Sequence, residues 1–574
     1  MMHPHGSHPL ARTLARAVAA GLIGALFACQ AGTAPIAASS AAENPGAHPE
    51  FDLGRHGWAV TGSPDAQRWF DQGQRWMYAF NHDEAVRAFS RATELDPSCA
   101  MAWWGIAICK GPHINNPAMD RPASEAAWVA LRNARAHARS STPVEQALIG
   151  ALEARYADPS SATIPLDAAA RAPLDRAYAD AMAEVHRRFP DQVEVEVLYA
   201  EALMDLRPWD LWSPDGQPRP ETPRILELLE SAMRRDPGHP GANHYYVHAI
   251  EASPFPERGE AAAARLRTLV PDSGHLVHMP SHIDVRRGRW NLAADQNAIA
   301  ATVHDAYERR SPRQGFYRSY MFHNTHFRAY ACMMAGRKAE AVAAARTMLA
   351  SIPDGYYRDY AALVDPYAPI EAESLLRFGM WDELLALPEP REELPITRAM
   401  WRFARAAALA AKGNTAAARD EQRRFRRSVA AVPPGAMMAI NPAEKVLRIA
   451  DNMLEGEILF REGGVDESVE RLRAAIEIED TLAYMEPPDW AQPVRHTLGA
   501  VLLHAGRPAE AELVYREDLR RWPENGWSLH GLADALEAMD RDGESSSVRA
   551  RATAAWSKAD LKGGPSCLCV PGSR

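Results

Sequence analysis

The sequence has few cysteines, no long basic tract and few runs of β-branched residues. Six cysteines among 574 residues are too few to be the main support of the fold, and their spacing fits no four-cysteine zinc site. A net charge of -10 without clustered lysine and arginine argues against a nucleic-acid partner. The scarcity of β-branched runs, together with abundant alanine, predicts an almost wholly helical chain.

The motifs of several enzyme classes are also missing. The chain has no glycine-rich phosphate loop, no GxSxG elbow and no dinucleotide fingerprint. In "NHYYVHAIE" the residue after His244 is Tyr245, so the HExxH arrangement of a zinc protease is absent too. No motif therefore indicates a reaction, and whether the protein is an enzyme stays open.

The first 38 residues have the pattern of an export signal. In "ARTLARAVAAGLIGALFACQAGTAPIAA" arginines precede a short apolar run, and small residues follow it. That run is too short for a permanent membrane span, and no second run in the chain is long enough. "LFAC" resembles a lipoprotein box and would place a lipid anchor at Cys29; cleavage near Ala34 or Ala38 is the alternative. We expect an exported protein, periplasmic or lipid-anchored at the cell envelope.

A repeat of 34 residues begins shortly after this segment. The stretch "AQRWFDQGQRWMYAFNHDEAVRAFSRATELDP" resembles a tetratricopeptide repeat, with Trp69, Gly73, Ala85, Phe89 and Pro97 at the signature spacing. Small residues at two of these positions let antiparallel helices approach, large residues fill the space between them, and the proline ends the second helix. The sequence therefore predicts helical hairpins.

A second clear copy lies near the C-terminus. "VRHTLGAVLLHAGRPAEAELVYREDLRRWP" carries Gly499, Ala511, Tyr515 and Pro523 in the same register, and weaker copies lie between the two. The expected fold is all-α: a tetratricopeptide-type α-solenoid, in which hairpins stack into a right-handed superhelix and first helices line a concave groove.

The resemblance extends beyond generic repeats. "LRPWDLWSPDGQP", "GANHYYVHAIEAS", "GHLVHMPSHI" and "EPPDW" together are similar to a group of long, exported bacterial tetratricopeptide proteins. This resemblance spans nearly the whole mature chain and implies the fold, but no particular chemistry. The repeat family in general implies a peptide or protein partner bound in the groove.

The expected organisation divides the chain into eight segments. They are a signal (1–38), a flexible leader (39–62), N-terminal repeats with a loop insertion (63–140), a helical segment ending in a Trp/Pro-rich loop (141–223), central histidine-rich units (224–356), degenerate repeats (357–450), C-terminal repeats (451–560) and a tail (561–574).

Histidines are concentrated in the central units. Nine of the 21 lie between His239 and His326, in three groups whose members are three, four or seven residues apart, as on one face of a helix. The candidate metal ligands are His244, His248, His275, His278, His282, His323 and His326. Imidazoles gathered from stacked hairpins suit a transition metal, with zinc or copper favoured, and seven ligands could serve two ions. The alternatives are a polar groove without metal and histidines that only hold the repeats together.

The middle group contains Pro280, and the residue before a proline is disfavoured as helix. We therefore expect Met279 to interrupt the helix, with His275 and His278 in the turn that enters it. Glu251 is the candidate catalytic residue. It could equally be a metal ligand or a partner that orients an imidazole, and the sequence does not rank these roles.

Two loops are candidates for the border of the pocket. One contains His113 and Asn116; the other, residues 207–223, contains Trp209 and Trp212 and either plugs the array or covers the groove. The segment around Glu486, Trp490, Arg495 and His496 is interpreted as scaffold, and Cys567 and Cys569 are able to form a disulfide in an oxidising compartment.

Overall fold

The computed structural model describes residues 51–161, 164–311, 315–561, 563–564 and 566–569. The predicted export signal and Cys29 lie outside these residues. The described chain is all-α apart from two strands of two residues each, β1 (Met437–Met438) and β2 (Asn441–Pro442), which pair antiparallel with Met438 opposite Asn441. No helix within the described ranges is both long enough and apolar enough to cross a bilayer.

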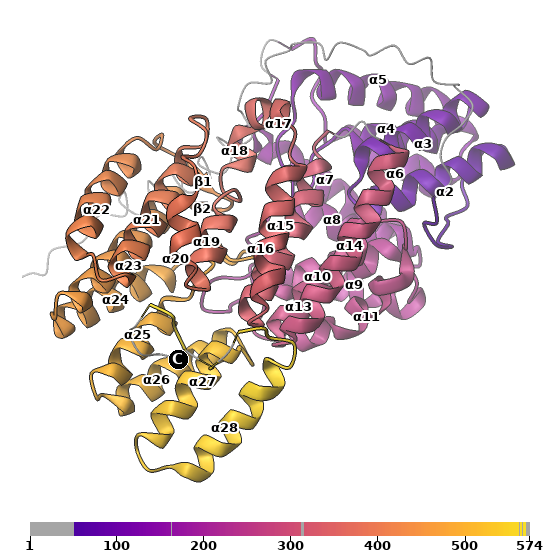
Figure 1. Ribbon diagram of the computed structural model, residues 1–574. Helices are drawn as coiled ribbons and strands as arrows, with labels where there is room; N and C mark the ends of the chain where they lie inside the picture. Colours follow the sequence, from indigo (N-terminus) through magenta and orange to yellow (C-terminus); the bar gives the residue numbers. More distant parts are fainter. Residues whose placement is uncertain (1–50, 162–163, 312–314, 562, 565, 570–574) are drawn as a thin grey trace, which may run out of the picture.

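The N-terminal and central helices form successive antiparallel hairpins (Figure 1). Their bounds are α2 Pro64–Tyr78, α3 His82–Leu95, α4 Ala100–Cys109, α5 Arg121–His137, η1 Ala138–Ser140, α6 Pro143–Glu153, α7 Ala168–Arg188, α8 Val193–Met204, α9 Thr222–Arg235, α10 Pro240–Glu251, η2 Pro256–Gly259, α11 Glu260–Leu269, α12 Gly274–His278, α13 Pro280–Arg286, α14 Trp290–Arg310, α15 Arg318–Met334 and α16 Lys338–Ser351.

The remaining helices continue the array. They are α17 Asp354–Asp359, α18 Ala361–Val364, α19 Ile370–Arg377, α20 Trp381–Ala386, α21 Pro395–Ala411, α22 Thr415–Ala430, α23 Ala443–Arg461, α24 Val465–Glu479, α25 Val494–His504, α26 Pro508–Arg521, α27 Gly526–Glu537 and α28 Asp542–Ala555.

The packing of the hairpins confirms the tetratricopeptide-type architecture. The Phe89 ring lies so close to Gly73 of its own hairpin and Gly105 of the next that a Cβ at either glycine would approach it to 2.6–2.7 Å. In the same way the Tyr515 ring fills the space between Gly499 and Gly531, where an added Cβ would lie 2.2–2.3 Å away. The signature glycines are thus required because a large side chain of the second helix sits between two first helices.

Polar side chains set where these helices begin. The Ser63 hydroxyl accepts the backbone N–H of Ala66 and Pro64 follows it, so α2 begins there. The side chain of Asn81 accepts the N–H of Glu84 and begins α3 in the same manner.

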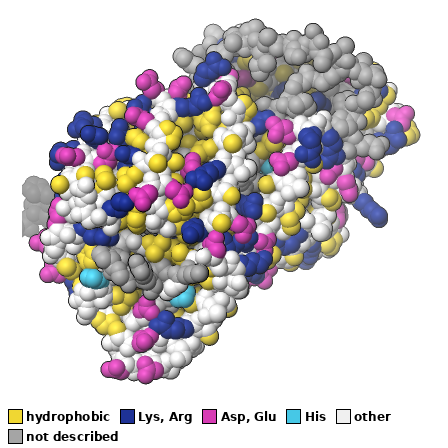
Figure 2. Space-filling model, in the orientation of Figure 1, with side chains coloured by type: hydrophobic (Ala, Val, Ile, Leu, Met, Phe, Trp, Pro, Cys, Tyr) yellow, Lys and Arg dark blue, Asp and Glu magenta, His cyan; other side chains and the backbone are white. Residues whose placement is uncertain are grey.

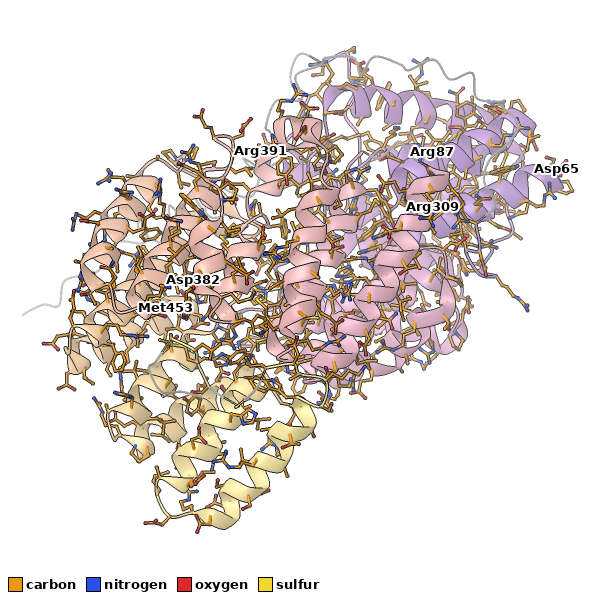
Figure 3. The ribbon with its side chains drawn as sticks, in the orientation of Figure 1. Asp65, Arg87, Arg309, Asp382, Arg391 and Met453 are labelled. Atoms are coloured by element: carbon orange, nitrogen blue, oxygen red, sulfur yellow. A yellow bond between two sulfur atoms is a disulfide. The ribbon has the colours of Figure 1, made fainter. Side chains whose placement is uncertain are left out.

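The C-terminal hairpins pack back onto the central ones. The indole N–H of Trp290 donates to the carbonyl of Pro523 at 2.9 Å, and that of Trp527 donates to the carbonyl of Met333 at 2.8 Å. Figure 1 shows α25–α28 as a group below the central helices. Ion pairs tie neighbouring helices at the surface, such as Asp382, labelled in Figure 3, with Lys412 at 2.5 Å. The array is therefore joined by contacts between distant repeats as well as by stacking.

Residues 51–62 differ from the flexible leader expected for this region. Leu53 is 2% exposed in the N-terminal core, the backbone N–H of Asp52 donates to the carboxylate of Asp272 at 2.9 Å, and that of Thr61 donates to Glu145 at 2.7 Å. The segment lacks helix but is held against the body by hydrogen bonds and an apolar anchor. Composition did not reveal this, because the partners lie far away in the sequence.

The described cysteines are of two kinds, buried thiols and a disulfide pair. Cys99, Cys109 and Cys332 are buried thiols, filling apolar space, and Cys567 and Cys569 form a disulfide.

Candidate metal centre

Four central helices carry the predicted ligands. Helix α10 contributes His244 and His248, and every residue of α10 is buried. The short helices α12 and α13 carry the middle group, and α15 carries His323 and His326. All four are first helices or parts of them, which places the three groups side by side in the stack.

The chain at Pro280 departs from the expectation. Met279 adopts helical dihedrals (φ -49°, ψ -35°) and links α12 directly to α13, so His275 and His278 belong to a short helix and not to an entering turn. The steric preference before proline is overridden here by tertiary packing, since Met279 is fully buried. His275, His278 and His282 therefore keep nearly helical spacing.

Six of the seven predicted ligands form two triads. In each, one candidate ligand atom per residue lies within 4.8 Å of the others. Triad 1 is His244, His248 and His275; triad 2 is His278, His282 and His323. The structure places His326 in neither triad: its ring contacts Tyr367 at 5.2 Å between centroids.

Triad 1 contains ring nitrogens without partners. The Nδ1 of His244 lies 2.7 Å from the carbonyl oxygen of Tyr78, so this nitrogen carries the proton and Nε2 has the lone pair. That Nε2 lies 3.1 Å from Nε2 of His275. Among the described residues, Nε2 of His248 and Nδ1 of His275 are buried and have no hydrogen-bond partner. Buried polar atoms of this kind are uncommon in native proteins and call for an explanation.

In triad 2, a ring nitrogen of His278 faces a ring nitrogen of His282. The Nδ1 of His278 lies 2.7 Å from Oδ1 of Asn297, whose amide nitrogen already donates to two other oxygens. The Nδ1 of His282 lies 2.5 Å from a carboxylate oxygen of Glu251. Both Nδ1 atoms therefore carry protons, yet the two Nε2 atoms face each other at 2.8 Å. Two lone pairs at that distance repel, so a proton on one ring or a shared cation must lie between them.

Glu251 connects the two triads. One of its oxygens lies 2.8 Å from Nδ1 of His248 and the other 2.5 Å from Nδ1 of His282. Burial opposes ionisation of Glu251, but the interactions with His282 and His248 outweigh it and hold its pKa at about 2. Of the three roles left open by the sequence, this geometry fits a carboxylate that orients imidazoles of both triads through the nitrogen that faces away from the ligand atom.

Burial also keeps most of the imidazoles neutral. Loss of hydration lowers the pKa of His244, His275 and His278 well below the ordinary histidine value, and neighbouring imidazoles lower it further. A neutral imidazole is the form that binds a metal.

The triads open onto a large cavity of about 3320 Å³. His248 and His275 of triad 1 and His282 and His323 of triad 2 line it. On the outer face shown in Figure 2 little histidine is visible, and charged side chains of both signs alternate. The clustered imidazoles lie inside the molecule, since His244, His275 and His278 are at most 2% exposed.

The two predicted loops border the same cavity. His113 and Asn116 line it and form a backbone bridge with each other. Trp209 and Trp212 line it as well; the Trp209 ring lies 5.4 Å from that of His248, and the Trp212 indole N–H donates to the carbonyl of Ala249 at 2.7 Å. The Trp/Pro-rich loop is therefore packed against α10 at the edge of the cavity.

A third group was not found from the sequence. Glu194 lies 3.0 Å from Nε2 of His56 and 3.3 Å from Nε2 of His239, and it also accepts the hydroxyl of Tyr78. The Nδ1 of His239 accepts the N–H of Ala242 and begins α10, so its Nε2 carries a proton that suits the carboxylate. Both Nε2 atoms lie within ion-pair distance of the Glu194 carboxylate, although neither makes a hydrogen bond of good geometry to it. Unlike triad 2, this group contains an anion that faces both imidazoles. The three residues are far apart in sequence, and His56 lay in the expected leader.

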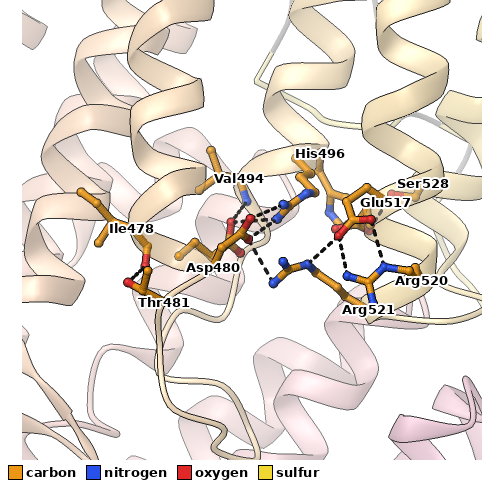
Figure 4. A network of polar contacts seen from close by, with 12 residues as sticks. Ile478, Asp480, Thr481, Val494, His496, Glu517, Arg520, Arg521 and Ser528 are labelled. Carbon is orange, nitrogen blue, oxygen red and sulfur yellow. Dashed lines mark hydrogen bonds and ion pairs between the residues drawn. The ribbon is translucent and has the colours of Figure 1, made fainter. Parts of the chain in front are cut away.

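The C-terminal histidine is part of an ionic network (Figure 4). The Nε2 of His496 lies 2.8 Å from Asp518, which also accepts the Ser528 hydroxyl at 2.7 Å, and Nδ1 accepts from Arg377 at 2.7 Å. Arg495 pairs with Asp480 at 2.7 Å and not with Glu486. The network supports the interpretation of this segment as scaffold.

Comparisons with known proteins concern the architecture only. Neither a scan against protein-family models nor a search of curated proteins finds a match. Among solved structures, the chain is similar to the human IFIT1 dimer with m7Gppp-AAAA at 13% identity, covering 84% of this chain and 88% of that one with a TM-score of 0.31. It is similar to Cut9 or Hcn1 of the APC/C hetero-tetramer at 11% identity, 85% and 76% coverage and a TM-score of 0.30. At these values the likeness extends no further than arrays of helices and carries no argument about a ligand.

Proposed function

We propose that the two histidine triads bind transition-metal ions, with zinc or copper favoured, as the site of a metal-dependent enzyme or a metal-handling protein. The observation that carries the proposal is the 2.8 Å contact between Nε2 of His278 and Nε2 of His282, whose Nδ1 protons are both committed to acceptors. A bound cation removes the repulsion between the two lone pairs.

The dimensions support this reading. Metal–imidazole bonds of about 2.0–2.1 Å separate two ligand nitrogens by roughly 3.3 Å at a tetrahedral angle. The two Nε2 pairs lie 2.8 and 3.1 Å apart, so a shift of about 0.2–0.5 Å would bring them to that spacing. Three histidines with a further position open to the cavity are the arrangement of catalytic zinc, whereas structural zinc is closed by four protein ligands. Glu251, Asn297 and the Tyr78 carbonyl occupy the Nδ1 side, as the partners that orient metal-bound imidazoles do.

The rival explanation is a proton in place of the ion. A protonated His282, paired with Glu251, would donate through Nε2 to His278. Burying such an imidazolium is costly, and it leaves Nε2 of His248 without a partner. The two explanations differ in metal content.

Metal analysis of protein purified without a histidine tag tests the proposal. We expect one to two ions per chain after reconstitution with zinc or copper, and chelators to remove them. A content below about 0.2 ion per chain after reconstitution with both metals contradicts metal binding, since ligands of this kind hold zinc tightly at neutral pH.

A second candidate function is recognition of a peptide or protein segment without catalysis. The cavity of about 3320 Å³ exceeds the roughly 300–1,000 Å³ of most small-molecule pockets, which favours a larger occupant. Replacing both His248 and His278 by alanine separates the candidates. Retained fold with lost metal supports a metal site, whereas collapse that does not depend on metal supports a purely structural role for the histidines.

Export is a further part of the proposal. The first 38 residues carry the features of a signal, and Cys29 is the candidate for lipidation. Cell fractionation followed by N-terminal sequencing tests this: an unprocessed N-terminus in the cytoplasmic fraction contradicts it.

A further inference from the structure

Arg286, at the end of helix α13 that carries His282, has no carboxylate partner among the described residues. It stands one helical turn after His282 on α13, so the two side chains share a face. Both line the cavity. Among the described residues, no carboxylate oxygen lies within 4 Å of its guanidinium, although arginines elsewhere on this surface, such as Arg287 and Arg289, pair with Glu260.

The contacts that Arg286 does make leave part of its donor capacity unused. One terminal nitrogen donates to the carbonyl of Ser253 at 3.0 Å, and the guanidinium lies over the ring of Tyr484 at 5.4 Å. Its Nε is buried and has no hydrogen-bond partner in the described part of the chain. An arginine at a cavity wall that has an N–H without an acceptor is suited to a carboxylate or phosphate, which a guanidinium binds with two parallel hydrogen bonds.

The acids near Arg286 do not neutralise it. Glu486 accepts the Tyr484 hydroxyl at 3.1 Å, but burial raises the pKa of Glu486 to about 8, so it is mostly an uncharged acid at neutral pH. Both oxygens of Glu251 face imidazoles of the triads and not the guanidinium. The cationic charge at this wall is therefore left for a ligand.

The positive charge of bound metal ions would also favour an anionic ligand at this wall. The six triad ligands are imidazoles, and one carboxylate, Glu251, serves both triads. Divalent ions held by neutral ligands carry a charge that needs an anion in a partly buried site. His282 and His323 of triad 2 line the same cavity as Arg286, so an ion held there would be accessible to an anion from the cavity.

We propose that Arg286 and a metal ion held by triad 2 together bind a small oxyanion, a carboxylate or phosphate group of a ligand that enters through the cavity. This inference rests on the proposed metal function. The guanidinium would supply N–H donors to the anion, and a metal held by the triad would supply a second positive charge. The ligand class is thus an anionic small molecule or the anionic end of a larger one.

Cobalt-loaded protein provides the test, because the visible absorption of bound Co²⁺ changes when an anion enters its coordination shell. Inorganic phosphate and acetate are titrated separately, which distinguishes the two sources of the oxyanion. We expect a saturable spectral change with at least one of them. In Arg286→Gln the apparent dissociation constant should rise about 10- to 100-fold, the loss of a hydrogen bond to a charged group, with the cobalt content unchanged.

Two variants make the result specific. Arg287→Gln removes a neighbouring cation that pairs with Glu260 and is the matched control; it should leave the titration unchanged. Arg286→Lys keeps the positive charge but not the pair of parallel N–H donors of the guanidinium, so an intermediate affinity is expected. It also answers the objection that Arg286→Gln misfolds.

The outcomes separate the two proposals. Protein that loads no cobalt contradicts the metal function and this inference with it. Protein that loads cobalt but shows no spectral response to either anion overturns the inference alone. Equal anion affinity in wild type and Arg286→Gln overturns the role of Arg286.

Discussion

The His278–His282 pair and His496 place buried imidazoles in opposite situations. His496 has a donor on one ring nitrogen, from Arg377, and an acceptor on the other, from Asp518. A single neutral tautomer satisfies both. His278 and His282 each have an acceptor on Nδ1 and face one another with Nε2, so no pair of neutral tautomers satisfies them.

The difference shows that a cluster of histidines is weak evidence for a metal site. Stronger evidence is a ring nitrogen whose neighbours offer it no suitable hydrogen-bond partner. The His56–Glu194–His239 group is as compact as either triad, yet each imidazole there has a carboxylate to meet. A cation is indicated where two ring lone pairs face each other with no anion or donor between them, because no choice of neutral tautomers then removes their repulsion. Each of the following experiments changes one residue, either in the C-terminal network or in the central histidine site.

Breaking the C-terminal network should have the largest effect, and it should not depend on metal. Asp518→Ala leaves His496 and Arg377 buried without their anion, which costs about 3–5 kcal/mol of unfolding free energy. The unfolding midpoint in urea should fall equally with zinc and with chelator. Asp466→Ala is the control: this aspartate is 94% exposed in its pair with Arg507, and its loss should cost about 0–1 kcal/mol. If zinc reversed the destabilisation of Asp518→Ala, the Asp518 network would depend on metal, and the distinction between it and the histidine triads would be wrong.

The central site should show the reverse behaviour: loss of metal with little loss of stability. His323→Ala removes a partly exposed member of triad 2, and affinity for one ion should fall about 100-fold or more, since changes behind the ligands alone cost about 10- to 100-fold. His326→Ala, three residues along the same helix, is the matched control and should keep both ions. Competition titrations with a chelating dye measure both affinities. Equal losses in the two variants would contradict the assignment of the triads.

Much of the fold could be predicted from the sequence, because its signals are local. Gly73, Phe89, Gly499 and Tyr515 stand at fixed spacing, and the contacts they make follow from that spacing. The clustering of the histidines was predictable for the same reason, since each group occupies one stretch of helix.

The details that decide the chemistry depend on distant partners. Tyr78 lies 166 residues from His244, and Tyr484 reaches Glu251 from 233 residues away at 3.4 Å. No spacing rule connects such pairs. The exclusion of His326 was missed because a three-residue step brings Glu251 to His248 but does not bring His326 into triad 2, and spacing alone does not distinguish the two cases.

Replacing Glu251, which contacts both triads, should reduce metal affinity by an intermediate amount. Glu251→Gln keeps the shape but offers one oxygen and one NH₂ where two Nδ1 protons need acceptors, so one imidazole must move its proton to the ligand nitrogen. Affinity for metal should fall about 10- to 100-fold, measured by the same dye competition. Glu230→Gln, which contacts Tyr246 and Arg258 at the surface, should change nothing. Unchanged affinity in Glu251→Gln would mean that this carboxylate does not orient the ligands.

The smallest expected effect is on the pH dependence of stability. Because His326 lies outside both triads, it reports the effect of burial on an imidazole without any contribution from metal binding. Burial lowers the pKa of His326 to about 3, against about 6.5 in the unfolded chain. Below pH 6.5 the unfolded chain therefore binds more protons than the folded one, and stability falls as the pH falls from about 6.5 toward 3. This histidine contributes up to about 1.4 kcal/mol per pH unit. Urea unfolding of metal-free protein between pH 6.5 and 4.5 should show a slope that is shallower by that amount in His326→Gln. An identical slope would mean that the His326 ring is hydrated in the folded chain, and that burial alone does not explain why the neighbouring imidazoles are neutral.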